Sequence, residues 1–167
     1  MTELVVSKLM QHPLVELDPN ADVAFALEVA SLTRTHHFPM FRRGALVGIV
    51  CTCDMDDAPR DQRIGELAHP DVVTIPMQAN VGAAAQLMHD KLVGAVVALD
   101  GAIPCGILTR EQLTCADPRW LDYFDDQHCE ACRATKHLRP VAAGQLLCSS
   151  CASRARDQTW LETGGGD

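Results

Sequence analysis

The first 115 residues of the chain repeat themselves: shifting the sequence so that Leu9 falls on Leu67 aligns it with itself without a gap. Self-similarity at a fixed period is the signature of one supersecondary unit used more than once. The sequence therefore predicts two copies of a unit of about 50 residues. At this offset the matched pairs also include Ala21 with Ala79, Val23 with Val81, Ala26 with Ala84, Gly48 with Gly106 and Ile49 with Ile107.

Both copies show the same order of predicted elements. A short apolar strand precedes a helix, which Asn20 or Asp22 caps in the first copy and Asn80 in the second. Two strands joined by a tight turn follow, and Asp100-Gly101 is a strong hairpin signal. A polar segment able to form a second helix ends each copy. In chain order, the strands and polar segments are expected at residues 14–17, 38–41, 45–51 and 52–60, and at residues 72–75, 94–99, 103–109 and 110–115.

Two C-x-x-C pairs near the C-terminus, Cys129 with Cys132 and Cys148 with Cys151, predict a metal site. Two such turns place four thiolates around one ion, and a complete sulfur shell is typical of a structural zinc site. Tetrahedral sulfur also accepts iron, but the Pro and Gly usual beside rubredoxin cysteines are missing, which favours zinc. Residues 133–147 suit a β-hairpin and residues 152–161 a helix, so the module resembles a zinc ribbon or treble-clef finger.

Four other cysteines lie in or beside the repeats. Cys51 and Cys53 are two residues apart at a predicted strand end, where a redox or second metal role competes with simple packing. Packing is favoured, because buried free cysteine commonly serves as a small apolar side chain. Cys105 and Cys115 have no partner nearby in sequence, and we expect them to fill space.

The repeated order of elements, with Gly48-Ile49-Val50-Cys51-Thr52-Cys53-Asp54 and Gly106-Ile107-Leu108-Thr109-Arg110-Glu111-Gln112 at the two ends, resembles a tandem pair of CBS domains. The resemblance covers about two-thirds of the chain. It implies an α/β (α+β) fold in which two β-α-β-β-α units pack their sheets face to face around a pseudo-twofold axis. Such pairs usually dimerise into a flat disc and bind adenine nucleotides or related ligands in clefts between the repeats.

The resemblance also implies where a ligand binds. In the family a Thr or Ser in the end motif meets phosphate, and an Asp three residues later meets ribose hydroxyls. Each copy here keeps half of that motif: Asp54 follows Cys51, with Thr52 one place along, whereas Thr109 precedes Gln112. His37, Phe38 and Pro39 match the segment that lines the base pocket, and Glu16 and Thr74 supply further contacts. The site is therefore expected to hold AMP, ADP, ATP or a relative; another ligand or a packed cleft remains the alternative.

Charge is unevenly distributed along the 167 residues, whose net charge is −8. Residues 1–128 hold 9 Lys and Arg against 18 Asp and Glu, which makes them a poor nucleic-acid surface. Residues 129–156 carry a net charge of +4, either a solvated basic face or a weak anionic contact. We expect a cytoplasmic protein, because the N-terminus lacks a signal-peptide pattern and no apolar run reaches the ~20 residues that cross a bilayer.

The expected organisation is repeat 1 at residues 1–60, repeat 2 at 61–115, a connector helix at 116–128, the metal module at 129–161 and a tail at 162–167. Since the sequence offers no nucleophile–base pair and no open metal position, we expect a regulatory ligand-sensing protein rather than an enzyme. Its expected partners are a second copy of the chain, a small-molecule ligand and a protein that meets the zinc module. The alternatives are a nucleic-acid or transcription-apparatus adaptor and a rubredoxin-like iron electron carrier.

Overall fold

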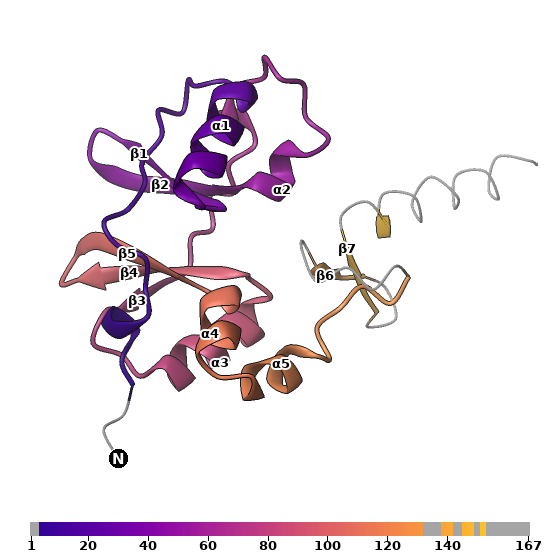
Figure 1. Ribbon diagram of the computed structural model, residues 1–167. Coiled ribbons are helices and arrows are strands. Elements are labelled where there is room, and N and C mark those ends of the chain that lie inside the picture. Colours follow the sequence, from indigo (N-terminus) through magenta and orange to yellow (C-terminus); the bar gives the residue numbers. More distant parts are fainter. Residues whose placement is uncertain (1–3, 132–137, 142–144, 149–150, 153–167) are drawn as a thin grey trace, which may run out of the picture.

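The computed structural model describes residues 4–131, 138–141, 145–148 and 151–152. Residues 4–131 contain four layers, helix, sheet, sheet and helix (Figure 1). The two sheets lie next to each other in the middle, and the helices of each repeat cover the outer face of that repeat's own sheet. The expected α/β fold with two related halves is confirmed.

The two repeats have matching elements, whose bounds keep the offset between Leu9 and Leu67. In repeat 1, helix α1 (Val23–Thr33) is followed by strands β1 (His37–Arg42) and β2 (Ala45–Cys51) and the short helix α2 (Thr52–Met55). In repeat 2, strand β3 (Thr74–Pro76) precedes helix α3 (Val81–Lys91), strands β4 (Ala95–Asp100) and β5 (Ile103–Thr109) and helix α4 (Arg110–Ala116). The predicted helices and hairpins are thus confirmed, although α2 is much shorter than the segment 52–60 expected to contain it.

Local chemistry explains why these elements begin and turn where they do. The side chains of Asp22 and Asn80 accept hydrogen bonds from backbone N–H groups in the first turns of α1 and α3, as helix caps do. Arg43, Gly44 and Gly101 have positive φ angles in the two hairpin turns, and glycine adopts that conformation without steric cost. Each repeat then buries its own apolar cluster between helix and sheet, around Phe38 and Met40 in repeat 1 and around Met88 and Leu108 in repeat 2.

One predicted strand, residues 14–17, is absent from the described residues, and two prolines account for its loss. In repeat 2, β3 pairs in parallel with β4: the Val97 N–H donates to the Val73 carbonyl at 2.9 Å, and the Met77 N–H to the Leu99 carbonyl at 2.8 Å. The residues at the two donor positions of repeat 1 are Pro39 and Pro19. Proline has no N–H to donate, so these two bonds of the ladder cannot form in repeat 1, whose described sheet has only two strands.

The leading segments of the two repeats pack on each other's cores. The 3-10 turn Val6–Lys8 precedes repeat 1 but lies against repeat 2: the Val6 N–H donates to the Ala79 carbonyl at 2.9 Å. The equivalent turn, Ile64–Glu66, lies against repeat 1, with the Ile64 N–H donating to the Ala21 carbonyl at 3.0 Å. Residues 4–115 are therefore interlocked, and neither repeat completes its core alone.

The exchange of leading segments also explains why each repeat has a glycine in the middle of its second hairpin strand. Gln11 forms two backbone hydrogen bonds with Ile107, and His69 forms the equivalent two with Ile49. A Cβ atom on Gly106 would lie 3.0 Å from the Gln11 carbonyl oxygen, and one on Gly48 would lie 3.1 Å from the His69 carbonyl oxygen. Both glycines therefore make room for the crossing segment of the other repeat.

Beyond the repeats, helix α5 (Arg119–Phe124) leads to a small hairpin of strands β6 (Leu138–Pro140) and β7 (Leu146–Cys148) (Figure 1). The hairpin confirms the antiparallel pair predicted between the two cysteine pairs. The helix predicted over 152–161 lies outside the described residues except for Ala152. None of the described helices is long and apolar enough to span a membrane.

Candidate functional site

The two repeats approach each other closely where their end motifs lie. His37, the first residue of β1, pairs with Cys51 at the end of β2, and Ala95, the first residue of β4, pairs with Thr109 at the end of β5. A Cβ atom on Gly94 would lie 3.6 Å from His37 Nε2, ordinary van der Waals distance. The ends of both repeats therefore meet across the His37–Gly94 contact, and we refer to the residues around it as the motif-end cluster: His36, His37, Cys51, Thr52, Cys53, Asp54, His69, Thr109, Arg110 and Gln112.

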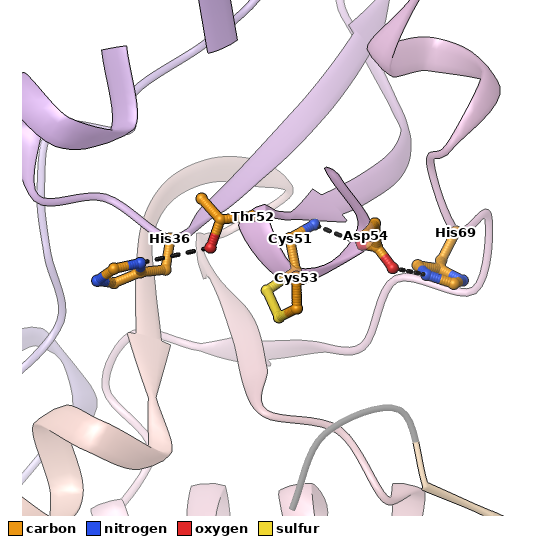
Figure 2. Close-up of a disulfide and its surroundings, with 6 residues drawn as sticks. All are labelled: His36, Cys51, Thr52, Cys53, Asp54 and His69. Atoms are coloured by element: carbon orange, nitrogen blue, oxygen red, sulfur yellow. Dashed lines mark hydrogen bonds and ion pairs between the residues drawn. A yellow bond between two sulfur atoms is a disulfide. The ribbon is translucent and has the colours of Figure 1, made fainter. Parts of the chain in front are cut away.

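The repeat 1 side of the motif-end cluster is organised by Asp54. One carboxylate oxygen, Oδ2, accepts a hydrogen bond from the Cys51 N–H at 2.7 Å, which closes the first turn of α2. The other, Oδ1, lies 2.9 Å from Nε2 of His69, a residue on the segment that crosses from the second repeat (Figure 2). A carboxylate has about four positions at which it can accept a hydrogen bond. The contacts with Cys51 and His69 fix the orientation of the Asp54 carboxylate.

Thr52 lies on the other side of the same turn. Its N–H donates to the His36 carbonyl at 2.9 Å, and its hydroxyl is 3.5 Å from Nδ1 of the His36 ring (Figure 2). The Arg110 N–H makes the matching bond to the Gly94 carbonyl at 3.0 Å in the second repeat. The backbone is therefore the same in both halves of the cluster, whereas the side chains differ.

The repeat 2 side uses a threonine and a glutamine in a reciprocal cap. The Thr109 hydroxyl accepts a hydrogen bond from the Gln112 N–H at 3.2 Å, and Gln112 Oε1 accepts one from the Thr109 N–H at 2.8 Å. This arrangement is the capping box of a helix start. Gln112 takes the place of Asp54, since both hold the N–H of the residue that ends the preceding strand.

The remaining predicted ligand residues lie elsewhere. Phe38 is fully buried in the apolar core of repeat 1, so Pro39, next along the strand, faces the opposite side of the sheet. Thr74 lines a hollow of about 370 Å³ beside the two hairpin turns, at the strand ends away from the motif-end cluster. Glu16 is exposed on the irregular segment that replaces the missing strand. The other predicted ligand residues lie at the two motif ends: Thr52 and Asp54 beside Cys51, Gln112 on Thr109, and His37 next to Gly94.

Arg110 connects the motif-end cluster to the C-terminal part of the chain. Its guanidinium donates to the carbonyls of Val93 at 3.0 Å and Met88 at 3.3 Å, beside the end of α3, and to Oε1 of Gln127. The guanidinium carbon also lies 4.6 Å from the centre of the Phe124 ring, a cation–π geometry. Burial lowers the pKa of Arg110 from its ordinary value, and the charge of Asp126 opposes that shift.

Gln127 completes this connection. Its Nε2 donates to the His89 carbonyl at 2.6 Å, and the side chain is almost fully buried. The His89 ring lies 3.2 Å from the Asp126 carboxylate and packs beside the Tyr123 ring. The connector is thus fixed to repeat 2 by a residue directly after Thr109, and Gln127 is two residues before Cys129. Sequence periodicity does not reveal these contacts, because they join residues 17 or more positions apart.

Replacing Arg110 with methionine should loosen the connector. The substitution preserves an unbranched side chain but removes the donors to two carbonyls and to Gln127, and leaving buried acceptors unpaired costs about 1–3 kcal/mol of stability. Urea denaturation of the full chain measures the effect. Arg119→Met is the control, because the Arg119 side chain is 89% exposed. Equal stabilities of the two variants would contradict the role given to Arg110.

The cysteine cluster at the C-terminal end matches a metal site. The sulfur atoms of Cys129, Cys148 and Cys151 all lie within 4.8 Å of one another, and all three residues are buried. Sulfurs bound to one tetrahedral zinc are separated by roughly 3.8 Å, given a Zn–S bond of about 2.3 Å. The Glu130 N–H donates to the Leu146 carbonyl at 2.9 Å, which fixes the first knuckle to β7. Cys132, the fourth predicted ligand, lies outside the described residues.

Known proteins share the architecture of the two repeats. Residues 64–117, which span repeat 2 and its leading segment, match the family model described as the CBS domain. The fold of the two repeats is that of a CBS-domain pair. A comparison with curated protein sequences gives no match.

Several solved structures have a similar fold. The CBS domain pair of protein MJ0100, in complex with 5′-methylthioadenosine and S-adenosyl-L-methionine, has a TM-score of 0.63 at 21% identity, over 70% of this chain and 98% of that one. The CBS domains of a transcriptional regulator from Streptococcus pneumoniae give 0.57 at 21% identity, over 66% and 97%. The cytosolic domain of the Mg²⁺ channel MgtE in complex with ATP gives 0.55 at 21% identity, over 65% and 46%. At these low identities the likeness concerns the fold.

Proposed function

We propose that this chain is a non-catalytic regulatory protein whose CBS pair binds a small adenosine-containing ligand at the motif-end cluster. The observation that supports the proposal is the proximity of His37 to Gly94, because His37 pairs with Cys51 at the end of one motif and Gly94 precedes Ala95, which pairs with Thr109 in the other. A carboxylate accepts the hydroxyl hydrogens of a ribose, and a hydroxyl can donate to phosphate or carboxylate oxygens. Two similar folds were solved with adenosine compounds, one with 5′-methylthioadenosine and S-adenosyl-L-methionine and one with ATP, and they support this class of ligand.

The zinc module is proposed to report the state of the ligand site to a protein partner. Four cysteine ligands would leave zinc no open position, so the metal stabilises the hairpin and takes part in no reaction. Arg110 directly follows Thr109 and donates a hydrogen bond to the side chain of Gln127, which is two residues before Cys129. A ligand that moves Thr109 therefore changes the position of the connector, provided that it prefers one of two arrangements. The competing nucleic-acid surface rests mainly on basic residues outside the described ranges.

Isothermal calorimetry of the zinc-loaded, reduced full chain tests the ligand proposal. The titrants are AMP, ADP, ATP, S-adenosylmethionine and 5′-methylthioadenosine. We expect heat of binding for at least one of them, and a loss of roughly tenfold in affinity for Asp54→Ala, about the worth of one hydrogen bond to a charged group. Asp56→Ala is the matched control, since Asp56 is exposed in the same segment. Absence of heat with all five compounds would refute the proposal.

The proposal includes a homodimer formed through α1. Phe25 and Leu32 lie one above the other on the outer face of this helix, and their side chains are 52% and 77% exposed. Phe25→Asp should shift the chain from dimer to monomer in light scattering after size-exclusion chromatography. Ile103→Asp serves as the control, because Ile103 is 70% exposed on a hairpin rather than on α1. A monomeric unsubstituted chain would contradict the dimer.

A further inference from the structure

Cys51 and Cys53 are joined by a disulfide inside the motif-end cluster (Figure 2). The expectation of two free thiols is therefore wrong, although Cys51 is buried, as the packing role favoured from the sequence requires. Cys51 ends strand β2 and is the cap residue of α2, and Cys53 lies within α2. Cys51 is buried, whereas Cys53 is partly exposed, which favours Cys53 as the point of attack by a soluble thiol.

The position of Cys51 gives this disulfide its importance. Cys51 corresponds to Thr109 in the alignment of the two repeats. The backbone N–H of each residue donates to the side chain three positions later, Asp54 in repeat 1 and Gln112 in repeat 2. The Thr109 hydroxyl carries a hydrogen, which it donates to Gln112 Oε1 at 3.2 Å. A sulfur in a disulfide carries none, whereas a thiol has a weak S–H donor. The oxidation state of Cys51 thus decides whether repeat 1 has a donor at the place where repeat 2 has a hydroxyl.

The two candidate ligand groups of repeat 1 lie on either side of Cys53. Thr52 precedes it and approaches His36, and Asp54 follows it and approaches His69. The disulfide closes a small ring through Cys51, Thr52 and Cys53, so it limits the backbone that carries Thr52 and leads into Asp54. Opening that ring allows the first turn of α2 to adjust to a ligand. Cys105 and Cys115 have no such neighbours, and burial raises the pKa of the Cys105 thiol.

We infer that Cys51 and Cys53 form a reversible thiol–disulfide modification site that sets the affinity of the motif-end cluster for its ligand. The inference rests on the proposed function for its ligand. The co-reactant is a small dithiol or glutathione. A thiolate attacks one sulfur, the Cys51–Cys53 bond breaks, and a mixed disulfide forms; a second thiolate then releases it. The chain gains two electrons and two protons as two thiols, and the reductant leaves as its own disulfide.

The reduced form is the one that binds more tightly. Its Cys51 thiol supplies a donor at the Thr109-like position, and its open ring lets Thr52 and Asp54 move. The oxidised form lacks the donor and holds the turn in place. A difference of about fivefold or more in affinity is in the range of ordinary coupling between two sites.

The first arm of the test measures the modification alone. The zinc-loaded full chain is equilibrated in buffers with different ratios of reduced to oxidised glutathione, alkylated with iodoacetamide, digested and mapped by mass spectrometry. The peptide containing Cys51 and Cys53 should carry two alkyl groups in reducing buffer and none in oxidising buffer, and the change should reverse. A peptide that stays fully alkylated across the series, or that never becomes alkylated, would overturn the inference.

The second arm measures the consequence, with S-adenosylmethionine as the probe. Affinity should fall at least about fivefold on oxidation. Cys51→Ser and Cys53→Ser should bind equally in both buffers, while Cys115→Ser, exposed and outside the cluster, should keep the redox response. Equal affinity of the unsubstituted chain in both buffers would overturn the regulation. Absence of binding in both buffers contradicts the proposed ligand and leaves the first arm to decide whether the cysteines react.

Discussion

Cys148→Ser is expected to abolish zinc binding and to unfold the C-terminal hairpin, while the two repeats stay folded. Strands β6 and β7 have three residues each, and their core consists of the cysteines with Leu138, Leu147 and Ala152. So small a core cannot hold a fold without a staple. In zinc-finger peptides the metal contributes about 10–16 kcal/mol, so losing one thiolate removes the main source of stability.

Elemental analysis of the purified chain, together with hydrogen exchange followed by mass spectrometry, measures this effect. We expect one zinc per unsubstituted chain, much less in Cys148→Ser, and fast exchange in β6 and β7 of the variant alone. Cys115→Ser is the control, because Cys115 is an exposed free cysteine at the end of α4. Purified protein with one iron and no zinc would contradict the assignment of the metal. Loss of protection in α3 and β4 as well would show that the two units do not fold separately.

Gly106→Val is expected to weaken the interlock between the two repeats and to destabilise both of them. A Cβ atom at this position would lie 3.0 Å from the Gln11 carbonyl and 2.5 Å from Met10 Sδ. The methionine can move, but the carbonyl is held by a backbone bond between Gln11 and Ile107. Overpacking of this kind costs about 1–3 kcal/mol. Gly48→Val should have a similar effect, since Gly48 faces His69 in the same way.

Urea denaturation followed by far-ultraviolet circular dichroism measures both variants. Gly94→Ala is the matched control: its Cβ would lie at an ordinary 3.6 Å from His37, so we expect stability within about 0.5 kcal/mol of the unsubstituted chain. The exchange of leading segments predicts a single transition for both repeats. Stabilities of Gly106→Val and Gly48→Val equal to that of Gly94→Ala would contradict the interlock.

The repeat allowed most of the fold to be predicted, because period and turn signals are local. The helices start at caps that the sequence displays, and the hairpins follow from apolar runs on either side of Gly44 and Gly101. The prediction of a strand at residues 14–17 was wrong. The segment has the apolar pattern of a strand, but Pro19 and Pro39 lack the backbone N–H groups that would pair it with β1. Because Pro39 lies on the neighbouring strand, it removes a hydrogen bond to residues 14–17 without changing their own hydrophobic pattern.

The candidate site was less accessible to sequence reasoning for a related reason. Thr109, Gln112 and Asp54 were identified from their motif, but their partners come from elsewhere in the chain. His69 reaches Asp54 because the segment leading into repeat 2 crosses to repeat 1, and the period of the repeat contains no sign of that exchange. The Cys51–Cys53 bond was not predicted either, because a cysteine at the end of an apolar strand is equally consistent with a buried free thiol.

Chemical-shift mapping of the isotope-labelled, reduced full chain with S-adenosylmethionine tests the central claim most directly. If the motif-end cluster is the ligand site, the backbone signals that change most belong to Thr52, Asp54, Gly94, Thr109 and Arg110, with smaller changes at Gln127. Changes concentrated at Thr74 and the hairpin turns, or no changes at saturating ligand, would contradict the account.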